Sequence, residues 1–148
     1  MTTLSENRRV RFDYTILERV DAGIELFGHE VKSIKAAKMT LAGSFGVVRG
    51  NEIYLIGSNI PPYQVGNVSK DYDPTRSRRL LLKREEIIEL ISKMKERGLT
   101  LIPLRVYTKG GLVKIELGLC RGKRGPDKRE AIRKREVKRE VDRTLKRE

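Results

Sequence analysis

The sequence predicts a mainly β fold: a small closed β-barrel of about six antiparallel strands with two or three helices, followed by a basic C-terminal tail. Several short apolar runs alternate with polar residues at the period of a half-buried strand. Gly-Asn or Gly-Gly pairs separate some of these runs, which is typical of hairpins. A chain of 148 residues suffices for one domain and a tail, and a body of about 120 residues has room for one modest core.

The first strands are expected between Phe12 and Phe27. Spaced apolar residues over 14–20 indicate one strand, 21–23 (Asp-Ala-Gly) indicates a turn, and 24–26 indicates a second strand. Residues 1–11 are polar and basic, so the sequence predicts a loosely held N-terminal arm before the barrel.

The middle of the chain predicts one helix, one hairpin and one long loop. Residues 28–38 have a helical composition and a length of about three turns, which suits a cap over one end of a barrel. Two apolar runs, 45–48 and 53–56, flank Gly50-Asn51 and predict a hairpin. Residues 59–79 are irregular, contain three prolines, and are expected to form a functional or mobile loop.

Residues 85–97 give the clearest helical pattern. Acidic residues lie at its start, basic residues at its end, and Gly98 follows as the stop signal. Its apolar stripe consists of Ile87, Ile88, Leu90, Ile91 and Met94. A second hairpin, 99–107 with 112–119, turns at Gly110-Gly111. Short hairpin-linked strands with one helix before the last pair predict an OB-like barrel over 12–120, a fold that binds nucleic acid on a strand face and its loops.

The tail, 121–148, differs sharply in composition from the body. It holds 13 of the chain's 33 Lys and Arg residues against six acidic residues, and no aromatic residue. Val137, Val141 and Leu145 form only a thin apolar stripe, which cannot offset the entropy of ordering a helix in water. We therefore expect the tail to be disordered when free and to become helical on a polyanion.

Several function classes are disfavoured. No apolar run approaches the roughly 18 residues that cross a bilayer, and no signal peptide is expected at the N-terminus. The single Cys120 excludes an internal disulfide and fits a reducing cytoplasm. With one histidine and one cysteine, the chain lacks a two-His metal site or a nucleophilic triad, so we expect no enzyme, no cofactor and no bound metal. His29 is interpreted as a surface or cap residue and Cys120 as a buried small hydrophobe.

The charge points to nucleic acid. The net charge is +13, and the basic residues concentrate at both ends and in residues 70–84. The alternative, a solvated charged face, does not explain this excess of one sign. Asp13, Glu25 and Glu30 are more simply surface acids or ion-pair partners than Mg²⁺ ligands. Few aromatic residues argue against a generic single-strand binder and favour structured RNA. If the body neutralises about six phosphates, affinity falls as roughly the fifth power of salt.

At this point the residues resemble a known family, the SsrA-binding proteins, SmpB. The motifs carrying the resemblance follow in chain order from residue 7 to the tail: Asn7-Arg8-Arg9, Asp13-Tyr14, Ala22-Gly23-Ile24, Gly28-His29-Glu30-Val31-Lys32-Ser33, the run 73–82 (DPTRSRRLLL), the run 98–104 (GLTLIPL), Gly122-Lys123-Arg124 and Asp127-Lys128-Arg129. The chain departs from the family pattern at His29, where Thr or Ser is common, and in 39–44, which lacks the usual Asn and Asp.

The resemblance implies an OB-like barrel that binds the tRNA-like domain of tmRNA and delivers it to ribosomes stalled without a stop codon. The tail would enter the decoding centre and the empty mRNA channel of the small subunit, becoming helical there. Alanyl-tRNA synthetase and elongation factor Tu would be partners indirectly, through tmRNA, and the protein would be a cytoplasmic monomer. The alternatives are a structural ribosomal protein with an extension threading rRNA, and an RNA-modifying enzyme or nuclease.

The resemblance also implies site residues. The expected tmRNA-binding set is Asn7, Arg8, Arg9, Tyr14, Glu30, Val31, Lys32, Ser33, Lys35, Arg76, Arg78 and Arg79. The expected ribosome-binding set in the tail is Gly122, Lys123, Arg124, Asp127, Lys128, Arg129, Arg133, Lys134, Val137, Val141 and Leu145. Helix capping is the alternative role for Glu30 and Ser33, and core packing is the alternative for Val31. Asp127 is interpreted as a cap of the induced helix.

Overall fold

A computed structural model describes residues 1–64, 66 and 68–123. The described residues form seven strands and three helices: β1 (Thr2–Glu6), α1 (Val10–Asp13), β2 (Tyr14–Ile24), α2 (Gly28–Lys35), β3 (Phe45–Arg49), β4 (Glu52–Ile56), β5 (Arg78–Leu81), α3 (Arg84–Arg97), β6 (Thr100–Lys109) and β7 (Leu112–Gly122). The tail was expected to be disordered when free; its residues after Lys123 lie outside the described part of the chain.

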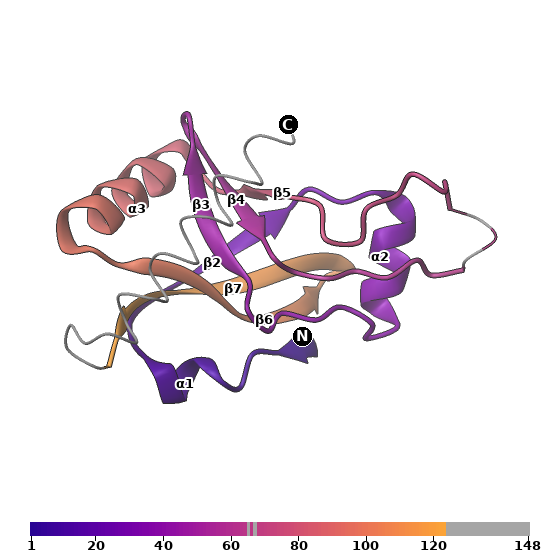
Figure 1. The fold of residues 1–148 in the computed structure, drawn as a ribbon, viewed down its shortest axis with the longest axis horizontal. Helices are drawn as coiled ribbons and strands as arrows, with labels where there is room; N and C mark the ends of the chain where they lie inside the picture. The colour runs from indigo at the N-terminus through magenta and orange to yellow at the C-terminus, as the bar shows by residue number, and fades with distance from the viewer. Residues whose placement is uncertain (65, 67, 124–148) are drawn as a thin grey trace.

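The strands close into a ring. Antiparallel pairing runs β6–β3–β4–β5–β2–β7, and β7 pairs back onto β6 (Figure 1). β3 meets β6 at a single residue pair, Gly46 with Leu101. A Cβ at Gly46 would lie 3.0 Å from Leu101 Cδ2, so glycine is needed for this close approach. The mainly β, ring-closed fold of six strands is confirmed.

Two members of that ring differ from the prediction. The expected turn at 21–23 is wrong, because these residues continue β2 and pair with Glu116, Ile115 and Lys114 of β7. Gly23 serves a close approach instead: a Cβ there would lie 3.2 Å from Leu81 Cβ on β5. The two strands expected over 14–20 and 24–26 are therefore one strand, β2. The sixth strand of the ring is β5, which begins inside the stretch 59–79 that was expected to be irregular.

The N-terminal segment does not form a loose arm. β1 pairs with β6, with Thr2 opposite Thr108 and Glu6 opposite Arg105. Asn7 extends this attachment: its backbone N–H donates to the Leu104 carbonyl (2.8 Å) and its side-chain amide to the Pro103 carbonyl (3.0 Å). The hydrophobic pattern did not predict β1, because its residues are mostly polar. A strand can pair with an open sheet edge through backbone hydrogen bonds, which do not require apolar side chains.

The helices cover the barrel at different places. α2 lies with the 59–77 connection at one end, and α3 lies at the opposite end (Figure 1). Ile87 and Leu90 of α3 join the main core inside the ring, whereas Ile88, expected in the apolar stripe, is 59% exposed. A smaller cluster under α1 contains Val10, Ile102, Leu104 and Cys120. Gly98 ends α3 in the left-handed conformation (φ +62°), as its position after the helix predicts.

Candidate nucleic-acid interface

A single buried carboxylate organises the α2 end of the barrel. Glu30 Oε1 accepts hydrogen bonds from the Phe27 backbone N–H (2.8 Å) and from Arg76 Nη2 (2.5 Å). Its Oε2 accepts from Arg78 Nη2 (2.6 Å) and lies 2.9 Å from the Tyr72 hydroxyl. Both Glu30 and Arg78 are fully buried. The carboxylate therefore ties the start of α2 to the chain segment leading into β5.

These contacts hold Glu30 ionised. Burial alone would raise its pKa, but hydrogen bonds from Arg76, from the Phe27 N–H and from Arg78 outweigh burial and lower the pKa to about 2. For Tyr72, burial and the hydrogen bond to Glu30 outweigh the opposing effect of Arg78 and raise its pKa to about 12. The cluster therefore keeps one fixed set of charges across the physiological pH range.

Burial corrects part of the predicted tmRNA-binding set. The side chains of Glu30, Ser33 and Arg78 are fully buried, so they cannot contact an RNA in this conformation. Glu30 caps α2, which is the alternative role considered for it. Ser33 does not cap the helix; its hydroxyl donates to the Pro61 carbonyl (2.7 Å) and fixes the loop. In this structure the three side chains connect α2 to the loop at Pro61 and to β5.

Other residues of that set are on the surface. Lys32 and Lys35 of α2 are exposed, and Val31 is half-buried. Arg76 keeps 23% of its side chain exposed, and its guanidinium Cζ lies 4.0 Å from the centre of the Phe27 ring. Arg8 and Arg9 are exposed. The side-chain amide of Asn7 donates a hydrogen bond to the Pro103 carbonyl, and Tyr14 packs on the cluster under α1.

A cleft of about 630 Å³ lies beside β5. Its lining comes from β2, β4, β5, β7 and the start of α3: Asp21, Gly23, Glu52, Arg79, Leu80, Leu81, Leu82, Lys83, Glu86 and Lys114. Two of its acids have protein donors, since Asp21 accepts from the Tyr107 hydroxyl (2.9 Å) and Glu86 from the Lys83 backbone N–H (3.0 Å). Arg79 forms ion pairs with Glu25 (2.9 Å) and with Glu52 (3.8 Å).

Sequence reasoning found only Arg79 in this cleft. It did not assign Lys83, Lys114 or Leu81 to a binding site, although Leu81 is 44% exposed. The alternation of 112–119 did place Lys114 on a wet face, so a signal for that residue was present. The alternation could not show that β7 pairs with β2. This pairing brings Lys114 opposite Gly23 and beside β5.

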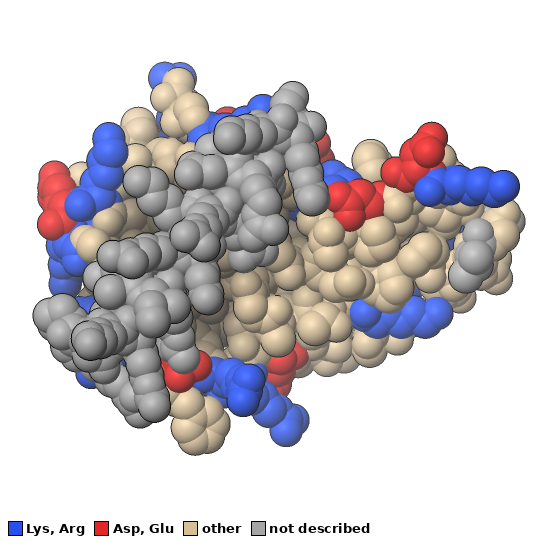
Figure 2. Space-filling view, in the orientation of Figure 1, with Lys and Arg blue, Asp and Glu red and all other residues tan. Residues whose placement is uncertain are grey.

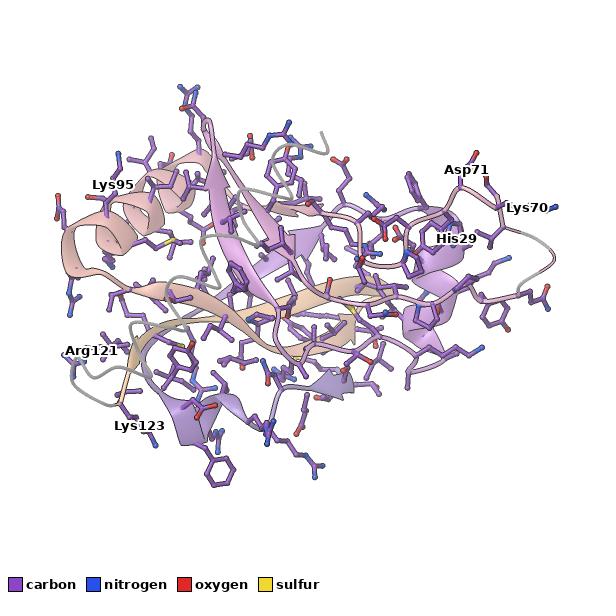
Figure 3. All side chains as sticks on the ribbon, viewed as in Figure 1. His29, Lys70, Asp71, Lys95, Arg121 and Lys123 are labelled. Atoms are coloured by element: carbon purple, nitrogen blue, oxygen red, sulfur yellow. The ribbon has the colours of Figure 1, made fainter. Side chains whose placement is uncertain are left out.

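A second basic surface surrounds α1 and the end of β7. It contains Arg8, Arg9, Arg11, Arg121 and Lys123, all exposed. Figure 3 shows Arg121 and Lys123 where β7 ends, near α1. The Lys123 N–H donates to the Asp13 carbonyl (3.1 Å), which attaches the residue after β7 to the end of α1. Phe12, in the middle of the cluster, is 81% exposed and was also missed.

In Figure 2 the visible Lys and Arg side chains lie mostly around the edge of this face, with Asp and Glu beside several of them, and a broad surface on its right half carries few charges. Cations grouped at separate places on one small barrel are suited to contact different phosphate backbones, or distant parts of one backbone.

The SmpB protein family model matches residues 4–147. The chain belongs to the SmpB protein family. SsrA-binding proteins of Synechococcus elongatus and Magnetococcus marinus are each 50% identical to it, over 97% of the chain and 94% and 95% of the respective relatives. A chain of the solved structure described as "tmRNA-SmpB: a journey to the center of the bacterial ribosome" is 46% identical, with a TM-score of 0.67, covering 86% of this chain and 93% of that one.

Most of the SmpB tail set lies outside the described residues: Arg124, Asp127, Lys128, Arg129, Arg133, Lys134, Val137, Val141 and Leu145. The two that are described behave differently from each other. Gly122 is the last residue of β7 and pairs with Tyr14 of β2. Lys123 is exposed.

The structure bears on the expected absence of metal and membrane sites only within the residues that it describes. Among these, no three His, Cys, Asp or Glu residues gather as metal ligands, and no helix is long and apolar enough to cross a membrane. Cys120 is buried, as predicted, and burial raises the pKa of its thiol to about 11. His29 is half-buried, with its ring 4.5 Å edge-on from Tyr72.

Proposed function

We propose that this chain binds the tRNA-like domain of tmRNA and delivers it to ribosomes stalled without a stop codon, where the incomplete peptide is tagged by trans-translation. The observation that carries the proposal is that one family-typical barrel presents two separate surfaces suited to RNA. A factor joining tmRNA to a ribosome has to contact both RNAs at once, and a single binding face would not suffice.

The cleft beside β5 is proposed to take the tRNA-like domain. Its cations, Arg79, Lys83 and Lys114, suit phosphates, and its carboxylates suit ribose 2′-hydroxyls, which donate hydrogen bonds. A mixed lining of this kind recognises the shape and backbone of a folded RNA more readily than a base sequence. Lys32 and Lys35 of α2 are exposed and offer two further cations for phosphates.

The α1 surface and the tail are proposed to face the ribosome. Arg8, Arg9, Arg121 and Lys123 surround the point from which the tail leaves the barrel. A basic tail with few apolar residues gains counter-charge only where RNA surrounds it, as in an unoccupied mRNA channel and decoding centre. Vacancy of the channel would then select stalled ribosomes, and the tail would become helical inside it.

The remaining parts of the proposal follow from this role. The chain binds and positions RNA and performs no chemical step, so it needs no cofactor. Alanyl-tRNA synthetase and elongation factor Tu act on the complex through tmRNA. The working unit is a monomer, located in the cytoplasm with the ribosomes it serves.

Truncation tests the division of labour. A chain ending at Lys123 keeps all of β7 and its bond to Asp13, whereas an end at residue 120 would shorten the β2–β7 ladder. The truncated chain should bind a tRNA-like-domain transcript within about threefold of the full chain at about 0.2 M salt, because salt at that concentration screens the long-range attraction of the tail. Tagging of peptides on ribosomes stalled on a truncated mRNA should be abolished; unchanged tagging would contradict the role of the tail.

A salt wash tests the alternative of a structural ribosomal protein. Binding dominated by phosphate contacts weakens steeply with salt, so ribosomes washed at high salt should lose this chain. Retention at one copy per ribosome would favour the structural component instead. Incubation of labelled tRNA with the chain and Mg²⁺ tests the remaining alternative, a nuclease or modifying enzyme, and should leave the length and mass of the RNA unchanged.

A further inference from the structure

An exposed aromatic ring and an arginine form a fixed pair at the α2 end of the barrel. Phe27, the residue before α2, is 52% exposed although it is fully apolar. The guanidinium Cζ of Arg76 lies 4.0 Å from the centre of the Phe27 ring. At this distance a planar guanidinium packs on the ring and holds its orientation.

The same buried carboxylate positions both members of the pair. Glu30 accepts the Phe27 backbone N–H through Oε1 and both Arg76 Nη2 (2.5 Å) and Arg76 Nε (3.2 Å) through its two oxygens. Arg78 holds Glu30 in turn. Little conformational entropy remains to be lost when a ligand meets the pair, which is the condition under which a small contact contributes to affinity.

The pair lies on a continuation of the two strands that border the cleft. β2 and β5 pair through Gly23 with Leu81 and Ile24 with Leu80, and the Glu25 N–H donates to the Arg79 carbonyl (2.9 Å). Beyond these contacts the two chain segments lead to Phe27 and Arg76. Four residues of extended chain cover at most about 13 Å, so Phe27 lies within about 13 Å of Gly23 in the lining of the cleft.

We propose that the Phe27–Arg76 pair stacks one unpaired base of the RNA that occupies the cleft, while Lys32 and Lys35 contact neighbouring phosphates. Bases in loops expose a π-face that aromatic rings and guanidinium planes stack upon, whereas bases inside a duplex are already stacked. Lys32 and Lys35, three residues apart on α2, share a helix face and are exposed. The proposal rests on the function proposed above and adds a contact that distinguishes a looped RNA from a plain duplex.

Tryptophan fluorescence tests the stacking directly, because the chain contains no tryptophan. Phe27→Trp places a single fluorophore in the pair, and a tRNA-like-domain transcript added at equal concentration should quench its emission. Phe12→Trp is the matched control: a second exposed phenylalanine, on the α1 surface, is replaced, and the same transcript should leave the emission of that variant unchanged. Phe27→Leu should weaken binding of the transcript about fivefold or more, and Phe27→Trp should retain the affinity of the unmodified chain.

The outcomes separate this inference from the proposed function. A transcript that binds all the variants equally and leaves the emission of the Phe27→Trp protein unquenched overturns the stacking pair and leaves tmRNA binding intact. Quenching of that emission by ribosomes but not by the transcript overturns the assignment to the cleft RNA. A transcript that fails to bind the unmodified chain overturns the proposed function itself. Urea unfolding of Phe27→Leu, expected to match that of the unmodified chain, excludes loss of fold as the cause of weaker binding.

Discussion

Replacing Glu30 by glutamine removes one charge from the buried cluster while keeping the shape of the side chain. Arg78 is fully buried and would then lack its counter-charge. Removing one partner of a buried ion pair typically costs about 3–5 kcal/mol. The pKa gives a separate figure: it lies at about 2 against an ordinary 4.5, a tenfold change in proton affinity corresponds to about 1.4 kcal/mol, and ionised Glu30 therefore stabilises the fold by about 3 kcal/mol.

The sign of the pH dependence follows from the lowered pKa. Because the folded protein binds the proton of Glu30 less readily than the unfolded chain, the stabilisation is complete above about pH 4.5 and is lost as the pH falls toward 2. Urea unfolding should show Glu30→Gln about 3 kcal/mol less stable than the unmodified chain at pH 7. That difference should shrink steadily between pH 4.5 and pH 2, where other carboxyl groups titrate alike in both proteins.

Glu25→Gln provides the matched control. Glu25 pairs with Arg79 at the surface, where 59% of its side chain is exposed, and its loss should change the free energy of unfolding by less than about 1 kcal/mol. A Glu30→Gln protein within about 1 kcal/mol of the unmodified chain at pH 7, or a stability difference independent of pH, would refute the account of the cluster.

Three further results are expected. Gly46→Ala should destabilise the fold by about 1–3 kcal/mol in thermal unfolding, because the added Cβ meets Leu101, whereas Gly28→Ala, with nothing within 4 Å, should be within about 1 kcal/mol of neutral. Cys120, buried and with a raised thiol pKa, should resist a thiol reagent at pH 8 until urea unfolds the chain, and rapid native labelling would contradict its burial. Lys114→Ala should reduce by about one the slope of log affinity against log salt for a tRNA-like-domain transcript; an unchanged slope would place Lys114 away from phosphate.

Local patterns predicted those parts of the fold that depend on neighbouring residues. The hairpin turns at Gly50 and Gly110-Gly111 have positive φ, which is why glycine marks them in the sequence. The helix over 84–97 ends at Gly98 for the same reason. Gly23 has a different use, since it admits Leu81 from a strand far away in the chain, and this is why a turn was expected where β2 continues.

The candidate site was less predictable, because its residues meet across long sequence separations. Glu30 and Arg78 are 48 positions apart, and no periodicity or spacing shows that one neutralises the other. The cleft needs β2, β5 and β7 side by side, a pairing that only the closed ring supplies. The resemblance to a family identified Glu30 and Arg78 as residues that matter, but it did not show whether they contact RNA or support the surface that does.

The three arginines between positions 76 and 79 show how a single basic run divides into different roles. Arg78 points inward with Leu80 and is neutralised by Glu30, while Arg79 lies on the opposite face of β5 and lines the cleft. Arg76, before the strand, packs on Phe27. Within this strand of four residues, alternation places Arg78 and Arg79 on opposite faces once the register is known. Counting all three as phosphate contacts therefore overstates the basic surface at this place, because Arg78 brings its own counter-charge and shows none of its charge to an RNA.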